Sequence, residues 1–139
     1  MDPGPLMSRL AEAGCKLALP VAIGKDSPLQ FRSAVDAPEL VCDVFGIPSP
    51  PEVATMVIPD LVIAPVLAFD RSGARLGQGG GLFDRTLALL RSSGNVFVLG
   101  LAYEGQRVDS VPAEPHDEPL DAILTERGYT EFLKASRCG

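Results

Sequence analysis

The sequence predicts an α/β fold class, arranged as a single three-layer domain with a mostly parallel sheet flanked by helices. Two continuous apolar runs, residues 61–68 and 96–102, are typical of strands that are buried on both faces. Between them, residues 82–90 place apolar side chains on one helical face. Strand, helix and strand in this order form a βαβ unit, which indicates a parallel sheet with a ligand site at the carboxyl edge of its strands.

The length and composition fit one compact domain spanning residues 1–139. A chain of 139 residues with 46% hydrophobic residues has enough apolar material for a core. The net charge of −6 provides no basic footprint, so nucleic acid is not an expected partner. The longest apolar stretch, 61–69, contains Pro65, and the first 14 residues lack the pattern of a targeting signal. We therefore expect no membrane association.

The cysteines and the histidine narrow the possible chemistry. Cys15, Cys42 and Cys138 are odd in number and far apart, which favours reduced thiols in a cytoplasmic protein over a disulfide framework. His116 is the single histidine of the sequence, so this chain supplies no pair of imidazoles for a common catalytic zinc site. Any metal is expected to bind through oxygen atoms.

The first part of the chain predicts one helix and two strands. Apolar periodicity indicates a helix over residues 6–13 that stops at Gly14, a typical helix C-cap. Residues 16–23 and 29–35 have the apolar and alternating patterns of strands, and residues 24–28 between them have the composition of a turn. Together these elements precede the βαβ unit.

Two further regions are less strongly patterned. Residues 36–45 are ambiguous, and the prolines that follow at positions 48, 50 and 51 predict an extended loop over the surface. Near the end of the chain, residues 120–124 form a short apolar run that predicts a last strand, and a terminal helix is expected from Thr130.

A glycine-rich run between the first buried strand and the predicted helix is the main functional signal. Its four glycines are Gly77, Gly79, Gly80 and Gly81. Glycine removes Cβ atoms from the path of a ligand and lets backbone N–H groups point outward. The helix that follows adds its unpaired amides and the positive end of its dipole, and Arg75 and Arg85 bracket the run with fixed charge. This combination favours a bound phosphate.

A structural turn is the competing interpretation, at about even odds from spacing alone. The run is not a Walker sequence, because Leu82 follows Gly81 where that motif requires lysine and then serine or threonine. It is also a poor dinucleotide fingerprint, because no acidic residue is convincingly placed about 20 positions further on.

Two aspartates add a possible metal site. Asp84 lies at the start of the predicted helix, and Asp117 lies in a proline-flanked loop after the second buried strand. Loops that follow neighbouring parallel strands meet at one edge of the sheet, so the two carboxylates are expected to converge near the phosphate. Each alone is more simply read as a solvated loop residue or a helix cap. Together with the glycines they favour Mg²⁺, which binds a few carboxylates plus substrate oxygens and water.

Five separated blocks resemble one known family. They are KLALPV, FGIPSP, PDLVIAPVLAFD leading into GARLGQGGGLFDRTL, GLAYEGQ, and VPAEPHD with LDAILTE. In this order they resemble the 5-formyltetrahydrofolate cyclo-ligase family, also called methenyltetrahydrofolate synthetase. The shared order is far more specific than any single motif, and residues 65–87 are nearly diagnostic by themselves.

The resemblance implies an enzyme that converts 5-formyltetrahydrofolate to 5,10-methenyltetrahydrofolate with ATP as co-substrate and Mg²⁺ as cofactor, releasing ADP and phosphate. It implies catalytic roles for Arg75 and Asp84, metal binding by Asp84 and Asp117, and a position near the folate for residues 79–83. The residues that it implies hold the ATP phosphates are Arg75, Leu76, Gly77, Gln78, Gly79, Gly80, Gly81, Leu82 and Phe83. The expected partners are ATP and 5-formyltetrahydrofolate, in a cytoplasmic monomer or weak homo-oligomer.

The chain differs from the family pattern in two places. Leu82 and Phe83 stand where members usually carry two aromatic residues with tyrosine next to the aspartate. The chain is also expected to lack the family's N-terminal segment, which contributes to nucleotide and folate binding. Both differences motivate an alternative function: a catalytically impaired nucleotide-binding or interaction domain on the same scaffold.

Overall fold

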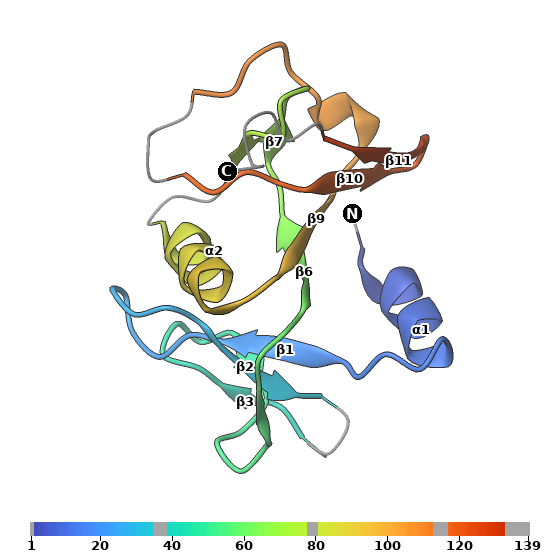
Figure 1. The fold of residues 1–139 in the computed structure, drawn as a ribbon. Coiled ribbons are helices and arrows are strands. Elements are labelled where there is room, and N and C mark those ends of the chain that lie inside the picture. Colours follow the sequence, from blue (N-terminus) through green and yellow to red (C-terminus); the bar gives the residue numbers. More distant parts are fainter. Residues whose placement is uncertain (1, 35–38, 78–80, 113–116, 133–139) are drawn as a thin grey trace. The chain divides into compact units, whose positions relative to one another are not determined.

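The computed structural model describes residues 2–34, 39–77, 81–112 and 117–132 (Figure 1). Contacts divide the chain into two compact units, residues 2–59 and the residues from Asp60 onward. In the described residues each unit combines strands with an α-helix, so the predicted α/β class is confirmed. The single domain over residues 1–139 stays a prediction. No helix within the described ranges is long and apolar enough to cross a membrane.

The unit of residues 2–59 begins with helix α1, Gly4–Glu12. Gly14 follows with φ of +95°, which confirms the predicted glycine stop because this left-handed conformation strains other residues. Strand β1, Ala18–Val21, then pairs antiparallel with β2, Gln30–Ser33, and β5, Met56–Val57, pairs with the other edge of β2. The predicted strand, turn and strand are therefore a β-hairpin, with both strands shorter than expected.

The extended surface loop predicted from Pro48, Pro50 and Pro51 is partly wrong, because its first residues belong to a second small hairpin that begins in the ambiguous region 36–45. Strand β3, Val41–Cys42, pairs antiparallel with β4, Pro48–Ser49. Asp43 closes the turn, since its Oδ1 accepts hydrogen bonds from the N–H groups of Phe45 (2.8 Å) and Ile47 (3.0 Å). An aspartate that holds its own turn gives no periodic signal, so the sequence pattern did not show this hairpin.

The unit from Asp60 onward is built on a four-stranded mixed sheet in the order β11-β10-β9-β6. Its strands are β6 (Leu61–Pro65), β9 (Phe97–Leu101), β10 (Ala122–Thr125) and β11 (Gly128–Glu131). The β6–β9 and β9–β10 pairs are parallel, and β10–β11 is antiparallel (Figure 1). Helix α2, Leu82–Ser93, connects β6 to β9, which confirms the predicted βαβ unit and its parallel sheet.

A short hairpin between β6 and α2 was not expected from the sequence. Strand β7, Ala68–Phe69, pairs antiparallel with β8, Arg75–Leu76. Arg75 therefore belongs to a strand, and the glycine run follows this hairpin instead of following β6 directly. The hairpin stays close to the carboxyl end of β6, because the N–H of Leu67 donates to the carbonyl of Leu76 at 2.8 Å.

The terminal helix expected from Thr130 is wrong at its beginning, because β11 occupies this position. Gly128 has φ of +141° and lets the chain reverse after β10, so that Thr130 pairs with Ile123 in the ladder. Buried Phe132 follows the strand. The remainder of the expected helix, residues 133–139, lies outside the described residues.

Asp70 stabilises the β7–β8 turn, and its replacement should lower the free energy of unfolding in a pH-dependent way. Its carboxylate accepts hydrogen bonds from Ser72 N and Oγ (2.9 and 2.6 Å), Ala74 N (3.2 Å) and Val111 N (2.8 Å). Burial alone would raise the pKa of Asp70, but these hydrogen bonds outweigh burial and lower it. The stabilisation is therefore fully present above the carboxyl pKa of the unfolded chain and is lost as pH falls through the lower folded value.

We expect Asp70→Asn to reduce the free energy of unfolding by about 1–3 kcal/mol at pH 7, because the amide nitrogen replaces an acceptor of N–H groups. Urea unfolding at pH 7 and at steps below pH 5 measures this difference. The difference in the free energy of unfolding between wild type and Asp70→Asn should become smaller as pH falls. A gap that stays constant down to pH 3, or an equal effect of Asp109→Asn at an exposed site, would contradict this role.

Candidate functional site

Arg75 is the buried positive charge of the site. Its side chain is only 4% exposed, and its Nη2 lies 3.4 Å from Oδ1 of Asp84. The guanidinium also lies over the Phe83 ring, 5.7 Å from its centroid. Burial lowers the pKa of Arg75, and the negative charges of Asp84 and Asp117 raise it in part. An arginine keeps its charge at neutral pH even so, and this charge lies at the start of α2.

The guanidinium lies against the backbone where the glycine run begins. A Cβ placed on Gly77 would come within 2.6 Å of Nη1 of Arg75. Glycine at this position therefore makes room for the arginine. Gln78, Gly79 and Gly80, which the family resemblance assigns to the phosphate site, lie outside the described residues.

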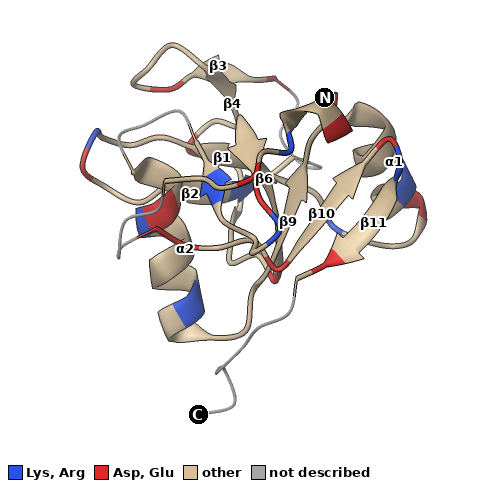
Figure 2. Cartoon of the chain, turned by 90° about the horizontal axis from the view of Figure 1, so that it is seen from above, with Lys and Arg blue, Asp and Glu red and all other residues tan. Residues whose placement is uncertain are grey.

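Helix α2 begins at the end of the glycine run. Gly81 is its N-cap residue, with φ of +67° in the left-handed region, and accepts the first helical hydrogen bond from Arg85 N at 2.9 Å. The first-turn amides, from Leu82 to Asp84, are of the kind that need an acceptor from outside the helix. Figure 2 shows acidic and basic residues side by side in this first turn. The helix start thus offers N–H donors beside a mixed pair of charges.

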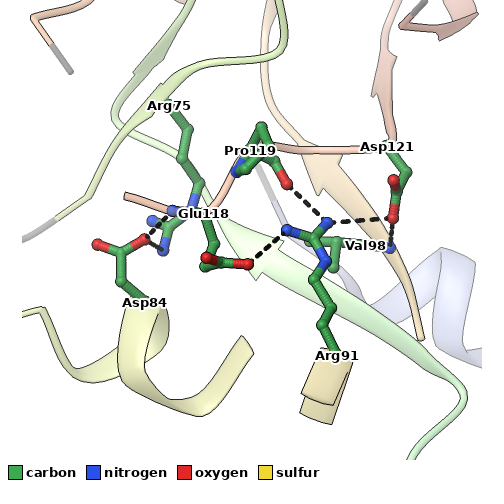
Figure 3. Close-up of polar contacts among 7 residues, drawn as sticks. All are labelled: Arg75, Asp84, Arg91, Val98, Glu118, Pro119 and Asp121. Carbon is green, nitrogen blue, oxygen red and sulfur yellow. Dashed lines mark hydrogen bonds and ion pairs between the residues drawn. The ribbon is translucent and has the colours of Figure 1, made fainter. Parts of the chain in front are cut away.

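Asp84 joins α2 to the segment that leads into β10. Its Oδ1 accepts a hydrogen bond from the Glu118 N–H at 2.9 Å and faces Arg75 (Figure 3). Asp117 precedes that N–H group in the chain and is close enough to act on the charge of Arg75. The structure therefore brings Arg75, Asp84 and Asp117 together, as the topology suggested. Their chemical roles stay predictions.

The donor set suits a hard divalent cation that also binds phosphate. Both recorded contacts of Asp84 use Oδ1, so Oδ2 is the oxygen that would ligate a cation, and the side chain is 19% exposed. Within the described residues no group of three or more histidine, cysteine, aspartate or glutamate side chains could hold a metal. A cation here would take two carboxylates and complete its shell with phosphate oxygens and water, as Mg²⁺ does.

Sequence reasoning missed Arg91, which lies in the last turn of α2. Its Nη1 bonds to Oε1 of Glu118 at 3.0 Å, and its Nη2 bonds to the carbonyl of Pro119 at 2.7 Å and to Oδ2 of Asp121 at 3.2 Å (Figure 3). The acceptors lie 27 to 30 positions away in the sequence, so no local spacing could have identified the contact.

Three polar residues just after β9 have mainly structural contacts. The Gln106 side chain donates to the carbonyl of Val66 at 2.8 Å and accepts from the Tyr103 N–H at 2.7 Å. Glu104 pairs with Arg107 at 2.6 Å. These contacts favour a structural role for this segment over a ligand contact.

Gly77→Ala should impair function with little loss of stability. The added Cβ would push the guanidinium of Arg75 aside, and a shift of about 1 Å at a reacting centre can cost about 100-fold in rate. The free energy of unfolding should fall by only about 1 kcal/mol, the lower end of the range for an added methyl group, because the displaced atom ends a flexible side chain. Nucleotide binding by calorimetry and thermal unfolding provide the two readouts. Gly94→Ala, at the far end of α2 where a Cβ meets open space, is the matched control. Equal nucleotide affinity in both variants would contradict the role given to this close approach.

Residues 3–126 match the family model described as the 5-formyltetrahydrofolate cyclo-ligase family. The chain belongs to this family. A 5-formyltetrahydrofolate cyclo-ligase of Mycolicibacterium smegmatis is 36% identical in an alignment of 136 positions that covers 91% of this chain and 69% of the relative. The enzyme of the same name from Escherichia coli K12 is 36% identical over 95% of this chain and 75% of its own length. Both of these relatives carry the name of an enzyme, 5-formyltetrahydrofolate cyclo-ligase.

Solved structures agree with the family. The chain superposes on the solution structure of Aquifex aeolicus 5,10-methenyltetrahydrofolate synthetase with a TM-score of 0.74 and 28% identity, covering 99% of this chain and 71% of that one. A second neighbour is the 5,10-methenyltetrahydrofolate synthetase of Mycoplasma pneumoniae, with a TM-score of 0.53 and 25% identity over 84% of this chain and 60% of that one. The resemblance drawn from the five sequence blocks is therefore confirmed.

Proposed function

We propose that this cyclo-ligase family member is an ATP- and Mg²⁺-dependent ligase that converts 5-formyltetrahydrofolate to 5,10-methenyltetrahydrofolate and releases ADP and phosphate. The observation that carries the proposal is the convergence of Arg75, Asp84 and Asp117 at the start of α2, beside the glycine run. Phosphoryl transfer needs mainly positioning and neutralisation of charge, and a buried arginine, two carboxylates and a helix N-terminus supply both.

In this proposal residues 75–83 hold the ATP phosphates, with residues 79–83 also near the folate. The backbone at Gly77 and the first-turn amides of α2 face phosphate oxygens, and Arg75 supplies positive charge. Asp84 and Asp117 would hold Mg²⁺, which neutralises phosphate charge when bound. Phe83 then has two tasks, because its ring contacts the guanidinium of Arg75 and also borders the folate position.

The chemistry follows two balanced steps. The formyl oxygen of the substrate attacks the γ-phosphorus of ATP, the bond to the β-phosphate oxygen breaks, and ADP leaves. The second folate nitrogen then attacks the activated formyl carbon, loses its proton, and expels the former formyl oxygen as part of inorganic phosphate. The charge of Arg75 stabilises the transferring phosphoryl group, and binding of both substrates at one site brings the reacting atoms together.

The finer features of the architecture belong to the same proposal. We propose a site at the carboxyl edge of the parallel strands, in a single three-layer domain over residues 1–139 that acts as a monomer or weak homo-oligomer. The three widely separated cysteines favour a reducing compartment, so we place the reaction in the cytoplasm.

Product absorbance tests the proposed function. Purified chain is mixed with 5-formyltetrahydrofolate, ATP and Mg²⁺, and the methenyl product is followed by its near-ultraviolet absorbance while ADP is measured separately. We expect product and ADP in equal amounts, and neither when ATP or Mg²⁺ is left out. ATP binding without product would instead support the alternative, a nucleotide-binding domain that has lost the reaction.

A further inference from the structure

We infer that Arg91 is a positioning residue for the metal and phosphate site, acting through the segment 118–121, which we call the strap. This inference rests on the proposed function, because it assigns the strap to the same site. Arg91 lies in the last turn of α2, whereas Asp84 lies in the first. The strap runs between them and is held at both ends of the helix (Figure 3).

The second half of the strap is fixed by backbone hydrogen bonds. The N–H of Leu120 donates to the carbonyl of Gly73 at 2.8 Å, and the N–H of Asp121 donates to the carbonyl of Val98 at 2.8 Å. The Val98 N–H in turn donates to Oδ2 of Asp121 at 2.7 Å. The two backbone hydrogen bonds tie Leu120 and Asp121 to the β7–β8 hairpin and to β9 without any contribution from Arg91.

The first half of the strap is held by α2. At Glu118 the N–H donates to Asp84 at 2.9 Å, and the side chain pairs with Arg91 at 3.0 Å. The carbonyl of Pro119 accepts a hydrogen bond from Arg91 at 2.7 Å. Arg91 thus fixes both residues that connect the anchored end of the strap to the site. The side chains of Arg91 and Glu118 are 13% and 24% exposed, so their ion pair is partly shielded from solvent and from salt.

The position of Glu118 determines two features of the proposed site. Its N–H orients the carboxylate of Asp84 through Oδ1, which leaves Oδ2 for the proposed cation. Asp117 is the next residue along the chain, so the position of its carboxylate depends on the same peptide unit. Groups that orient metal ligands without touching the metal typically change metal affinity by about 10- to 100-fold when they are replaced.

A purely structural role for Arg91 is the competing explanation. Its charge near the end of α2 also favours the helix dipole, and it neutralises the buried Asp121. Arg91→Ala removes all of these interactions together and can therefore lower stability for reasons unrelated to the site. Glu118→Ala is more selective, because it breaks the bridge to the strap and leaves Arg91 paired with Asp121.

The experiment compares Arg91→Ala, Arg91→Lys and Glu118→Ala with wild type, and uses Arg127→Ala in the exposed β10–β11 turn as control. Two readouts are taken. Amide hydrogen exchange at position 118 reports the strap without any metal or substrate. The Mg²⁺ concentration for half-maximal product formation, with KM values for ATP and folate, reports the site.

We expect amide hydrogen exchange at position 118 to be about tenfold faster in Arg91→Ala and in Glu118→Ala. In Glu118→Ala, exchange in β9 should stay unchanged. The Mg²⁺ concentration for half-maximal product formation should rise about tenfold in both variants, and the KM for folate should stay within about twofold of wild type. For Arg91→Lys we expect a Mg²⁺ requirement between those of wild type and Arg91→Ala. Unchanged exchange and an unchanged Mg²⁺ requirement in Glu118→Ala would overturn the inference, even if Arg91→Ala fails to fold. If wild type forms no product, the proposed function is refuted but the inference about Arg91 is not. Exchange at position 118 still decides whether Arg91 positions the strap.

Discussion

Asp84→Ala should abolish Mg²⁺-dependent ATP binding and lower kcat/KM by about a thousandfold or more. The variant loses the carboxylate oxygen that would ligate the cation, and it removes the negative charge that lies 3.4 Å from the buried guanidinium of Arg75. Several kcal/mol of lost charge stabilisation correspond to this factor in rate. Calorimetric titration with ATP, with and without Mg²⁺, measures the loss of binding directly.

Two further variants separate the charge of Asp84 from its structural contact. Asp84→Asn keeps an oxygen that can accept the Glu118 N–H, so its fold and strap should be preserved while metal binding is lost. Asp109→Ala removes an exposed carboxylate from the same unit and should leave binding intact. If Asp84→Ala binds ATP and Mg²⁺ as well as wild type does, Asp84 is not part of the site.

Arg75→Gln should lower kcat by about 100- to 1,000-fold. The guanidinium is the buried charge nearest the glycine run, and removal of one preorganised donor to a developing charge typically costs this much. Arg75→Lys should recover only part of the rate, because an ammonium cannot reproduce the flat fork that contacts both Asp84 and the Phe83 ring. Steady-state kinetics at saturating ATP and Mg²⁺ provide the measurement.

Arg71 offers the matched control for this prediction. It is exposed at the turn of the same β7–β8 hairpin, so Arg71→Gln removes an equal charge a few residues away. We expect its kcat to stay within about twofold of wild type. Equal losses in the two variants would indicate that overall charge matters, and that the buried position of Arg75 does not.

The sequence predicted the central part of the fold because burial leaves a strong pattern. The apolar runs at 61–68 and 96–102 became β6 and β9, which pair in parallel, and the amphipathic segment between them became α2. Each of these elements is long enough for its periodicity to be visible. The α/β class and the βαβ unit therefore followed from the residues alone.

Elements held by distant or very local contacts left no such pattern. The β7–β8 hairpin has two-residue strands, and its turn depends on Asp70, one of whose donors is Val111 N–H, 41 positions away. At the other end of the chain, apolar and polar residues near Thr130 fit either a helix or a strand. The left-handed glycine at 128 and pairing with β10 decided in favour of a strand.

In the candidate site, too, some features follow from the order of the elements and others depend on contacts between distant residues. Topology was enough to predict that Asp84 and Asp117 would converge, because chain order and strand direction determine which loops meet. The burial of Arg75 beside Gly77 and the contact between Arg91 and the strap depend on side-chain packing, which neither spacing nor composition reveals.

Isotope transfer tests most directly whether this site carries out phosphoryl activation of the folate. The substrate is labelled with ¹⁸O in its formyl group, and a single turnover is run with ATP and Mg²⁺. We expect inorganic phosphate to carry one ¹⁸O atom per methenyl product, with label transfer lost in Asp84→Asn. Methenyl product formed together with unlabelled phosphate, the ¹⁸O appearing in water, would contradict phosphorylation of the formyl oxygen at this site.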